Sequence, residues 1–267
     1  MADGILERIV ASVLRRLEET PPRDDLELVA GEAALARRRE GRRSLAAALA
    51  QVGPAVIAEC KHASPSAGLL REPFDPVALA RTYEAAGAAA ISVVTEPDFF
   101  RGDPAWIGRI RRAVSLPVLR KDFIVTRRQV LESAILGADA ILLIQRILDP
   151  PALEDLLMAA REFGLEVLLE IFADEDPEPA VASGASIIGV NARDLETFTT
   201  DLAAVEAKAA AIPADRLRVA ESGIRSAADV RRLHRAGYGA FLVGEHLVRS
   251  PDPGAALRGL LAPAGDD

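Results

Sequence analysis

The chain repeats one pattern eight times, a short apolar run followed by a segment with helical periodicity. The apolar runs are AVIAEC (55–60), AAISVVT (89–95), LPVLRK (116–121), ADAILLI (138–144), EVLLEI (166–171), SIIGVN (186–191), LRVAE (217–221) and AFLVG (240–244). Their ends are spaced by about 26 residues on average, which suits one strand, one helix and two short loops. Most runs are apolar throughout, as expected of parallel strands that are covered on both faces.

Between the runs lie segments typical of amphipathic helices, and four of them close on glycine: Gly87, Gly137, Gly164 and Gly237. Glycine favours the left-handed conformation in which helices commonly end. Eight strand–helix units in about 200 residues match a closed (β/α)8 TIM barrel, an α/β fold. An open doubly wound sheet is the alternative, although such a sheet usually has fewer strands, and no GxGxxG motif follows the first run.

Residues 1–50 lie outside this repeat. They predict two helices, LERIVASVLRRLEE (6–19) and AALARRREGRRSLAAALA (33–50), joined by a polar connection. We expect this N-terminal helical extension to cap the barrel mouth; a merely solubilising extension is the alternative. Because no Ser/Gly-rich linker follows it, we expect one domain over 1–267, with the extension at 1–50, the barrel at 51–262 and a disordered tail after Pro263.

Composition narrows the class of protein. Half of the 267 residues are hydrophobic and 27% are charged, enough for a large core and a charged surface. The net charge of −8 argues against nucleic acid or an anionic membrane as partner, although a local pocket can still bind a small anion. A single cysteine, Cys60, excludes an intrachain disulfide and fits a reducing cytoplasm. The chain has no secretory h-region and no apolar run of about 20 residues. We expect a cytoplasmic location.

Charged and polar residues gather where the predicted strands end, which is where barrels of this type carry catalytic groups. These residues are Glu59 and Lys61, Thr95 and Glu96, Lys121 and Asp122, Glu170, Asn191 and Arg193, and Glu221 and Ser222. One such charge is usually a salt bridge or a helix cap. Acids and bases on six strands instead predict a shared crevice in which they shift each other's pKa values.

The first predicted strand shows how alternation sorts these residues. Glu59 and Lys61 are two positions apart and therefore project to one face, whereas Cys60 projects to the other. We interpret Cys60 as a packing residue rather than a nucleophile. The three histidines, His62, His234 and His246, lack metal-ligand spacing, so we expect no metal site. The chain contains neither a Walker A motif nor a GxSxG elbow.

Two glycine-containing loops predict a phosphate site. ESGI (221–224) places Ser222 and Gly223 after the seventh strand, and FLVGEH (241–246) places Gly244 and Glu245 after the eighth. In TIM barrels these two loops commonly bind phosphate through backbone N–H groups, together with a short helix N-terminus. Either glycine alone could be an ordinary turn. The pair, in these two loops, favours the phosphate interpretation.

Eight segments resemble, in the same order, those of the indole-3-glycerol phosphate synthase family: ECKHASPSAG, SVVTEPDFFRGD, LRKDFIV, ADAILLI, GLEVLLEI, GVNARDLETF, AESGI and LVGEHL. The resemblance runs from about residue 45 to residue 250. It implies a TIM barrel that acts as a carboxy-lyase of tryptophan biosynthesis without a cofactor. The implied reaction converts 1-(2-carboxyphenylamino)-1-deoxyribulose 5-phosphate to indole-3-glycerol phosphate, with loss of CO2 and water. The implied partner is this phosphorylated small molecule, bound by a monomer; association with other enzymes of the pathway stays open.

The resemblance also implies a role for each catalytic candidate. Lys121 would be the general acid for ring closure, and a lysine among positive neighbours can have the lowered pKa that suits this task. Glu59 and Glu170 would be acid/base carboxylates, and Lys61 would contact the substrate carboxylate and assist dehydration. Asn191 and Glu221 would orient the ribulose hydroxyls.

Binding roles follow from the same resemblance. Arg193 would lie near the anthranilate carboxylate. Ser222, Gly223, Gly244 and Glu245 would hold the phosphate, the glycines mainly through backbone N–H groups. Pro65, Phe100 and Phe123 would enclose the aromatic ring, with Ser64 as a further binding residue in the loop that contains Pro65.

Four positions depart from residue types common in the family: Ala67, Phe172, Ala192 and His246. None removes a named acid, base or phosphate-binding group. These departures leave open a paralogue that acts on a substituted anthranilate derivative. Two further alternatives are another phosphate-binding barrel, such as a phosphoribosyl isomerase, and a non-catalytic barrel that binds a phosphosugar.

Overall fold

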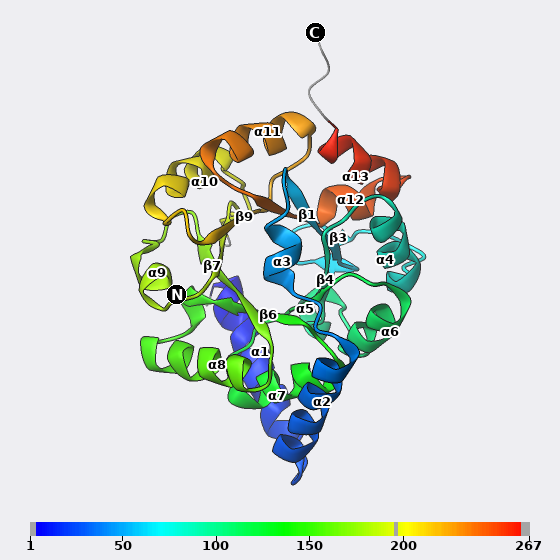
Figure 1. Ribbon diagram of the computed structural model, residues 1–267, viewed down its shortest axis with the longest axis vertical. Coiled ribbons are helices and arrows are strands. Elements are labelled where there is room, and N and C mark those ends of the chain that lie inside the picture. The colour runs from blue at the N-terminus through cyan, green and yellow to red at the C-terminus, as the bar shows by residue number, and fades with distance from the viewer. Residues whose placement is uncertain (1–3, 195–196, 263–267) are drawn as a thin grey trace.

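The computed structural model describes residues 4–194 and 197–262, and its eight longer strands form a closed parallel barrel (Figure 1). They are β1 (Ala55–Cys60), β4 (Ala90–Val94), β5 (Val118–Lys121), β6 (Ala140–Ile144), β7 (Glu166–Phe172), β8 (Ile187–Asn191), β9 (Leu217–Glu221) and β10 (Ala240–Val243). β1 pairs with both β4 and β10, which closes the sheet. The predicted TIM barrel is therefore confirmed, with strand ends within two residues of those expected, and the open sheet is excluded.

Helices surround the barrel. They are α4 (Pro76–Ala85), α6 (Ala105–Ala113), α7 (Arg127–Leu136), α8 (Pro150–Glu162), α9 (Glu178–Ala182), α10 (Leu202–Lys208), α11 (Ala227–Ala236), α12 (Glu245–Arg249) and α13 (Pro253–Leu261). Short elements lie in the loops: β2 (Ala63–Ser64), β3 (Gly68–Leu69), α5 (Pro97–Phe100), η1 (Gln145–Ile147) and η2 (Ala209–Ala211). The four glycines predicted to end helices all have positive φ, between 69° and 109°. The tail expected after Pro263 lies outside the described residues.

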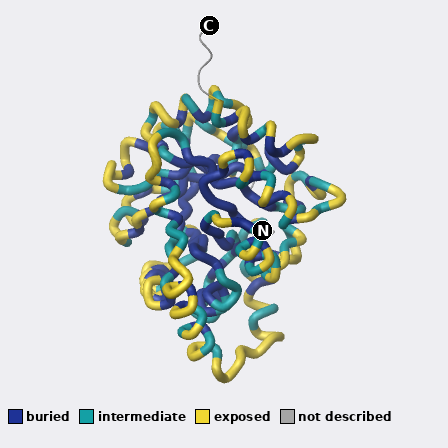
Figure 2. Tube along the Cα trace, turned by 45° about the vertical axis from the view of Figure 1, so that its right-hand side comes forward, coloured by how far each residue is buried: buried dark blue, intermediate teal, exposed yellow. Residues whose placement is uncertain are grey.

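Strand alternation divides the core into two layers. Inward-facing side chains such as Ile57, Leu119 and Leu168 fill the barrel, and their neighbours in sequence pack against the helices. Figure 2 shows the buried chain concentrated in the strands, with exposed residues on the surrounding helices and loops. Cys60 lies in the outer layer, as its position beside Glu59 predicts. Consequently the inward face of each strand leads directly to the barrel mouth.

The N-terminal extension differs in part from the prediction. The second helix, α2 (Leu26–Glu40), begins inside the expected polar connection and ends before Gly41. Gly41 has φ of +90°, which interrupts the helix, and Ser44 then caps a separate helix, α3 (Leu45–Leu49). The predicted single helix over 33–50 was therefore wrong. Leu26 and Ala30, one helical turn apart, pack on the outer core, so α2 begins earlier than its polar flank suggested.

The three N-terminal helices contact three different parts of the barrel. α1 (Ile5–Glu19) covers the mouth, where Arg16 Nη1 lies 2.9 Å from Glu96 Oε1. α2 packs beside α7 on the outside, and Arg37 donates to the backbone carbonyls of Ala134 and Phe163 near the ends of α7 and α8. α3 closes the opposite end of the barrel with Leu45 and Leu49. None of the helices among residues 4–194 and 197–262 is long and apolar enough to cross a membrane.

One side chain on the barrel holds α3. Glu166 Oε1 accepts from the Ser44 hydroxyl at 2.7 Å, and Glu166 Oε2 accepts from Ala46 N at 2.8 Å. We expect Glu166→Ala to lower the free energy of unfolding by about 1–3 kcal/mol, because the donors at the start of α3 lose a charged acceptor. Urea denaturation measures this change. The exposed Glu154 of α8 provides the control, since Glu154→Ala should change stability by less than about 0.5 kcal/mol. Equal effects of the two substitutions would contradict the anchoring role.

Candidate active site

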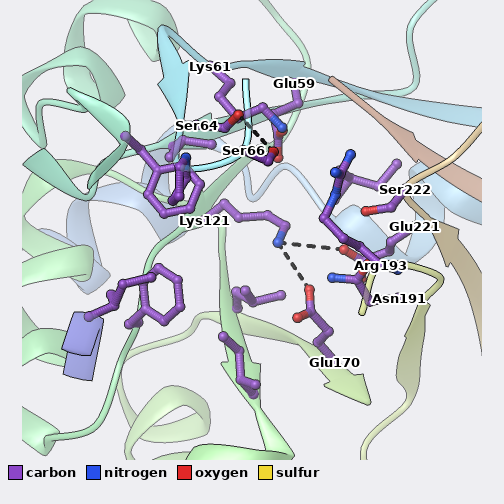
Figure 3. A pocket seen from close by; sticks show the side chains of 18 of the residues that line it. Glu59, Lys61, Ser64, Ser66, Lys121, Glu170, Asn191, Arg193, Glu221 and Ser222 are labelled. Carbon is purple, nitrogen blue, oxygen red and sulfur yellow. Dashed lines mark hydrogen bonds and ion pairs between the residues drawn. The ribbon is translucent and has the colours of Figure 1, made fainter. Parts of the chain in front are cut away.

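A cavity opens at the carboxyl ends of the strands, and Lys121 projects into its centre (Figure 3). Glu59, Glu170, Asn191 and Glu221 reach it from four other strands. These side chains come from the inward face of the barrel, where strand closure directs them toward one another. The predicted catalytic set is therefore brought together in one place.

The Lys121 ammonium lies between two carboxyl groups that come from different strands. Its Nζ lies 3.0 Å from Glu170 Oε2 on β7 and 3.6 Å from Glu221 Oε2 on β9. Burial lowers the pKa of Lys121, but the carboxylates of Glu170, Glu221 and Glu59 outweigh burial and raise it above the ordinary lysine value. The expected lowered pKa was wrong, because the neighbours of Lys121 are acids and not cations. Lys121 is accordingly a firmly protonated ammonium at neutral pH.

Glu59 and Lys61 form the second charged pair. Lys61 Nζ lies 2.9 Å from Glu59 Oε1, and the Ser92 hydroxyl donates to Glu59 Oε2 at 3.4 Å. Burial raises the pKa of Glu59, but Lys61 and then Lys121 outweigh it and hold that pKa below the ordinary glutamate value. Glu59 is therefore an ionised carboxylate inside the barrel and can accept a proton.

Glu221 has the opposite electrostatic character. Its side chain is almost fully buried, and neither carboxyl oxygen has a hydrogen-bond partner among the described residues. Burial, followed by the negative charge of Glu170, raises the pKa of Glu221 well above its ordinary value, against the opposing effect of Lys121. Glu59 and Glu221, two glutamates of one cavity, thus have pKa values shifted in opposite directions, which is the arrangement that acid–base chemistry requires.

One end of the cavity has the features of an anion site. Ser222 and Gly223 both have positive φ, 67° and 75°, and Gly244 caps the short helix α12. Backbone N–H groups in such turns and at helix N-termini have no partner within their own element. Sequence reasoning missed three basic residues that also line this end: Arg225, His246 and Arg249. Arg225 is two residues beyond Gly223 and could have been found from the loop alone.

The Glu245 side chain, predicted to hold the phosphate, pairs with two arginines at the anion end. Its carboxylate lies 3.3 Å from Arg193 Nη2 and 3.3 Å from Arg249 Nη1. A carboxylate repels phosphate, so Glu245 is suited to hold these two arginines rather than an anion. Asn191 contributes to the same corner, because its Oδ1 accepts from Arg193 N at 2.9 Å. Arg193 is thereby fixed at both its backbone and its guanidinium.

The other end of the cavity is aromatic and apolar. The rings of Phe100 and Phe123 are 6.0 Å apart, and Ser64 and Pro65 lie in the loop that faces them. Sequence reasoning missed eight further apolar residues that line the cavity: Ile5, Ile9, Val94, Leu142, Ile144, Phe172, Phe198 and Leu242. Ile5 and Ile9 come from α1, so the N-terminal extension supplies part of the cavity wall. Their contact with residues far along the chain left no local sequence signal.

Two of the predicted crevice residues do not reach the cavity. The Thr95 hydroxyl donates to Asp122 Oδ2 at 2.5 Å behind the strands, where Arg120 Nη2 also binds Asp122 Oδ2 at 2.8 Å. Glu96 accepts from backbone N–H groups of α5 and pairs with Arg16. The shared-crevice prediction was wrong for Thr95 and Glu96. Asp122 lines the cavity, but its carboxylate belongs to this buried structural network.

No group of three His, Cys, Asp or Glu side chains within 4–194 and 197–262 is arranged to hold a metal ion. Of the four departures from the family pattern, Phe172 lines the central cavity and His246 lines the anion end. Ala192 is buried in the outer core, and Ala67 packs against that core in partial exposure. The departures that face the cavity are therefore these two aromatic residues.

Solved structures resemble the fold at low sequence identity. A 3-hexulose-6-phosphate synthase aligns with a TM-score of 0.63 and 16% identity, covering 77% of this chain and 97% of its own. The Salmonella typhimurium 3-hexulose-6-phosphate synthase gives a TM-score of 0.62 at 16% identity, covering 77% and 96%. Similarity at this level supports the barrel fold alone.

Sequence comparison is more specific. An indole-3-glycerol phosphate synthase from Rhodopirellula baltica is 50% identical over 207 residues, which are 78% of this chain and 80% of the relative. The Desulfotalea psychrophila indole-3-glycerol phosphate synthase is 45% identical over 263 residues, which are 97% and 99% of the two chains. The family model described as Indole-3-glycerol phosphate synthase matches residues 6–260. With the eight-stranded barrel and its central lysine, this match establishes that the chain belongs to the indole-3-glycerol phosphate synthase family.

Proposed function

We propose that the protein is an indole-3-glycerol phosphate synthase of tryptophan biosynthesis, acting on 1-(2-carboxyphenylamino)-1-deoxyribulose 5-phosphate. The observation that carries the proposal is the Lys121 ammonium between Glu170 and Glu221, inside a cavity with an anion end and an aromatic end. The substrate has the same three parts in the same order: a phosphate, a ketose chain and an aromatic carboxylate.

The two ends of the cavity suggest how the substrate lies. Its phosphate is placed against the backbone of Ser222, Gly223 and Gly244, with Arg225 nearby. Its ring lies toward Phe100 and Phe123, where aromatic packing contributes both burial and orientation. In this proposed orientation the ketone lies between the phosphate and the ring, opposite Lys121.

In the first step, the aryl carbon attacks the ketone and forms the new ring bond, while negative charge develops on the ketone oxygen. The Lys121 ammonium stabilises that oxygen and donates its proton to it. A raised pKa does not prevent this transfer, because an alkoxide is more basic than an amine. Glu170, the nearer carboxylate, keeps Lys121 charged and directed into the cavity before the reaction.

Loss of CO2 then restores the aromatic ring, which acts as the electron sink, so the step needs no added cofactor. Arg193 and Lys61 are the cations proposed to hold the substrate carboxylate before it leaves.

Dehydration requires a base that removes a proton and an acid that protonates the departing hydroxyl. Glu59, kept ionised by Lys61 and Lys121, is the proposed base. Lys61 is the proposed acid, and Glu170 assists proton transfer beside Lys121. We assign hydroxyl orientation to Asn191 and Glu221.

The same proposal includes the biological setting. We infer a monomeric enzyme that works in the cytoplasm, where the buried thiol of Cys60 stays reduced. We also treat residues 1–267 as one domain, since α1, α2 and α3 each pack on a different part of the barrel. Association with other enzymes of the pathway remains part of the proposal and is testable by co-purification.

The activity is tested with purified protein and the carboxyphenylamino-deoxyribulose phosphate. We expect indole fluorescence to appear, and Lys121→Met to lower kcat by at least about 10²-fold with a little-changed substrate Kd, because a general acid acts in the transition state. Lys208 lies on α10, outside the cavity, and Lys208→Met is the matched control. If folded wild-type protein forms no product, the proposed activity is refuted. If Lys121→Met keeps wild-type kcat, the role of Lys121 as the general acid is refuted.

The pH dependence tests Glu59. With Lys61 present, the pKa of Glu59 is low, so an ionised base persists as the pH falls. Lys61→Met removes the strongest opposing charge, and burial then raises the pKa of Glu59. We expect the acid limb of the kcat/KM profile to move to higher pH in this variant. An acid limb at the wild-type position would exclude Glu59 as the base that this limb reports.

Ser222 tests the phosphate end. Its φ of 67° suits glycine, so Ser222→Gly removes the hydroxyl without backbone strain. We expect KM to rise about tenfold with kcat nearly unchanged, the effect of losing one hydrogen bond to a charged group. Inorganic phosphate should inhibit the variant correspondingly less. Ser115→Gly, at an exposed loop outside the cavity, is the control; a fall in kcat alone for Ser222→Gly would count against phosphate binding there.

A further inference from the structure

Small residues lie beside the glutamates on the inner face of the barrel. Most inward positions carry bulky side chains, as TIM barrel interiors generally do. Ser92 and Gly244 instead adjoin Glu59, and Gly189 adjoins Glu221. The glutamate carboxyls therefore occupy space that a larger side chain would fill.

Gly189 makes the closest of these approaches. A Cβ added at this residue would lie 2.1 Å from Glu221 Oε1 and 3.2 Å from Leu168 Cδ1. Gly189 pairs in register with Glu170 on β7 and with Val219 on β9, so it lies between the two acidic strands. The Glu221 carboxyl thus packs against the backbone of Gly189, which has no side chain.

The backbone itself does not require glycine here. Gly189 is in the interior of β8, and its φ is outside the left-handed range. Glycine inside a strand weakens the strand, because it loses more conformational freedom on folding and offers no side chain to pack. Ile187, two residues earlier on the same face, is a buried β-branched residue. The space beside Glu221 is therefore the physical reason for glycine at position 189.

The space beside Gly189 allows Glu170 and Glu221 to lie at different distances from Lys121. Glu170 lies 3.0 Å from Nζ, whereas Glu221 stays at 3.6 Å, and its oxygens have no hydrogen-bond partner among the described residues. A side chain at residue 189 would displace the Glu221 carboxyl from this position. The carboxyl would then move toward Lys121 or into the substrate space.

We propose that Gly189 is a positioning residue for the reaction: its missing side chain seats the Glu221 carboxyl away from Lys121, free to contact substrate. This inference rests on the proposed function. It assigns to Gly189 an effect exerted entirely through Glu221, without any contact between Gly189 and the substrate.

The central variant is Gly189→Ala. The atom in its way is the far end of a flexible side chain, so the barrel is expected to remain folded while the Glu221 carboxyl moves. We expect kcat to fall about 10- to 100-fold, as displacements near 1 Å in a catalytic site do. Gly239→Ala is the matched control, because a Cβ there meets nothing within 4 Å. Wild-type kcat for Gly189→Ala would overturn the proposal.

A second background separates positioning from general damage to β8. In Glu221→Ala the obstructing carboxyl is absent, so adding Gly189→Ala should leave kcat unchanged and should recover any stability lost in the single variant. An equal fold-loss of kcat in both backgrounds would overturn the proposal. Should Gly189→Ala alone fail to fold, recovery of folding in the double variant supports the proposal, and its absence refutes it.

Crystal structures provide a test that does not depend on turnover. In Gly189→Ala the Glu221 carboxyl should be displaced from its wild-type place, with β8 unmoved. If β8 moves and the Glu221 carboxyl stays in its wild-type place, the positioning role of Gly189 is refuted. If wild-type protein makes no product, the proposed function fails, yet these structures still decide whether Gly189 positions Glu221.

Discussion

The charge balance around Lys121 is the interaction on which the rest of the site depends. Two ammonium groups, Lys61 and Lys121, face three glutamates, Glu59, Glu170 and Glu221, so full ionisation would leave one excess negative charge. An uncompensated buried charge costs several kcal/mol, and the least well paired group is therefore the one that retains a proton. Glu221 has no hydrogen-bond partner among the described residues, and its pKa is raised well above the ordinary glutamate value. The excess of acids keeps Lys121 charged, whereas the nearby cations Lys61 and Lys121 keep Glu59 ionised.

The choice of cation follows the same logic across the chain. Lysine occurs only at positions 61, 121 and 208 of the sequence, and the other basic side chains, histidines aside, are arginines. Arg37 and Arg120 make multiple fixed hydrogen bonds in structural positions, which suits a planar guanidinium that stays charged. A compact ammonium can give up its proton, and two of the three lysines are in the cavity. These two lysines are the cations to which the proposed mechanism assigns proton transfer.

Much of this arrangement could be predicted from sequence, because it depends on local periodicity. Apolar runs defined the strands, and alternation placed Glu59 inward and Cys60 outward. The same alternation, applied from Ser92, would have directed Thr95 outward, so that error was avoidable. The pKa of Lys121 was not predictable, since Glu170 and Glu221 are 49 and 100 positions away in the chain. The contribution of α1 to the cavity wall likewise depends on tertiary packing.

In the proposed mechanism, chemistry and substrate recognition belong to different parts of the fold. Glu59, Lys121, Glu170 and Glu221 belong to strands of the closed barrel, whose hydrogen-bonded neighbours hold each backbone on both sides. The anion end and the aromatic end are built instead from loops, the short helix α12 and the N-terminal helix α1. Loops vary without disturbing the barrel, whereas a shift of a strand would alter every acid–base distance at once. Substitutions such as Phe172 and His246, at the edge of the strand framework, can therefore retune substrate contacts while the central charge arrangement stays fixed.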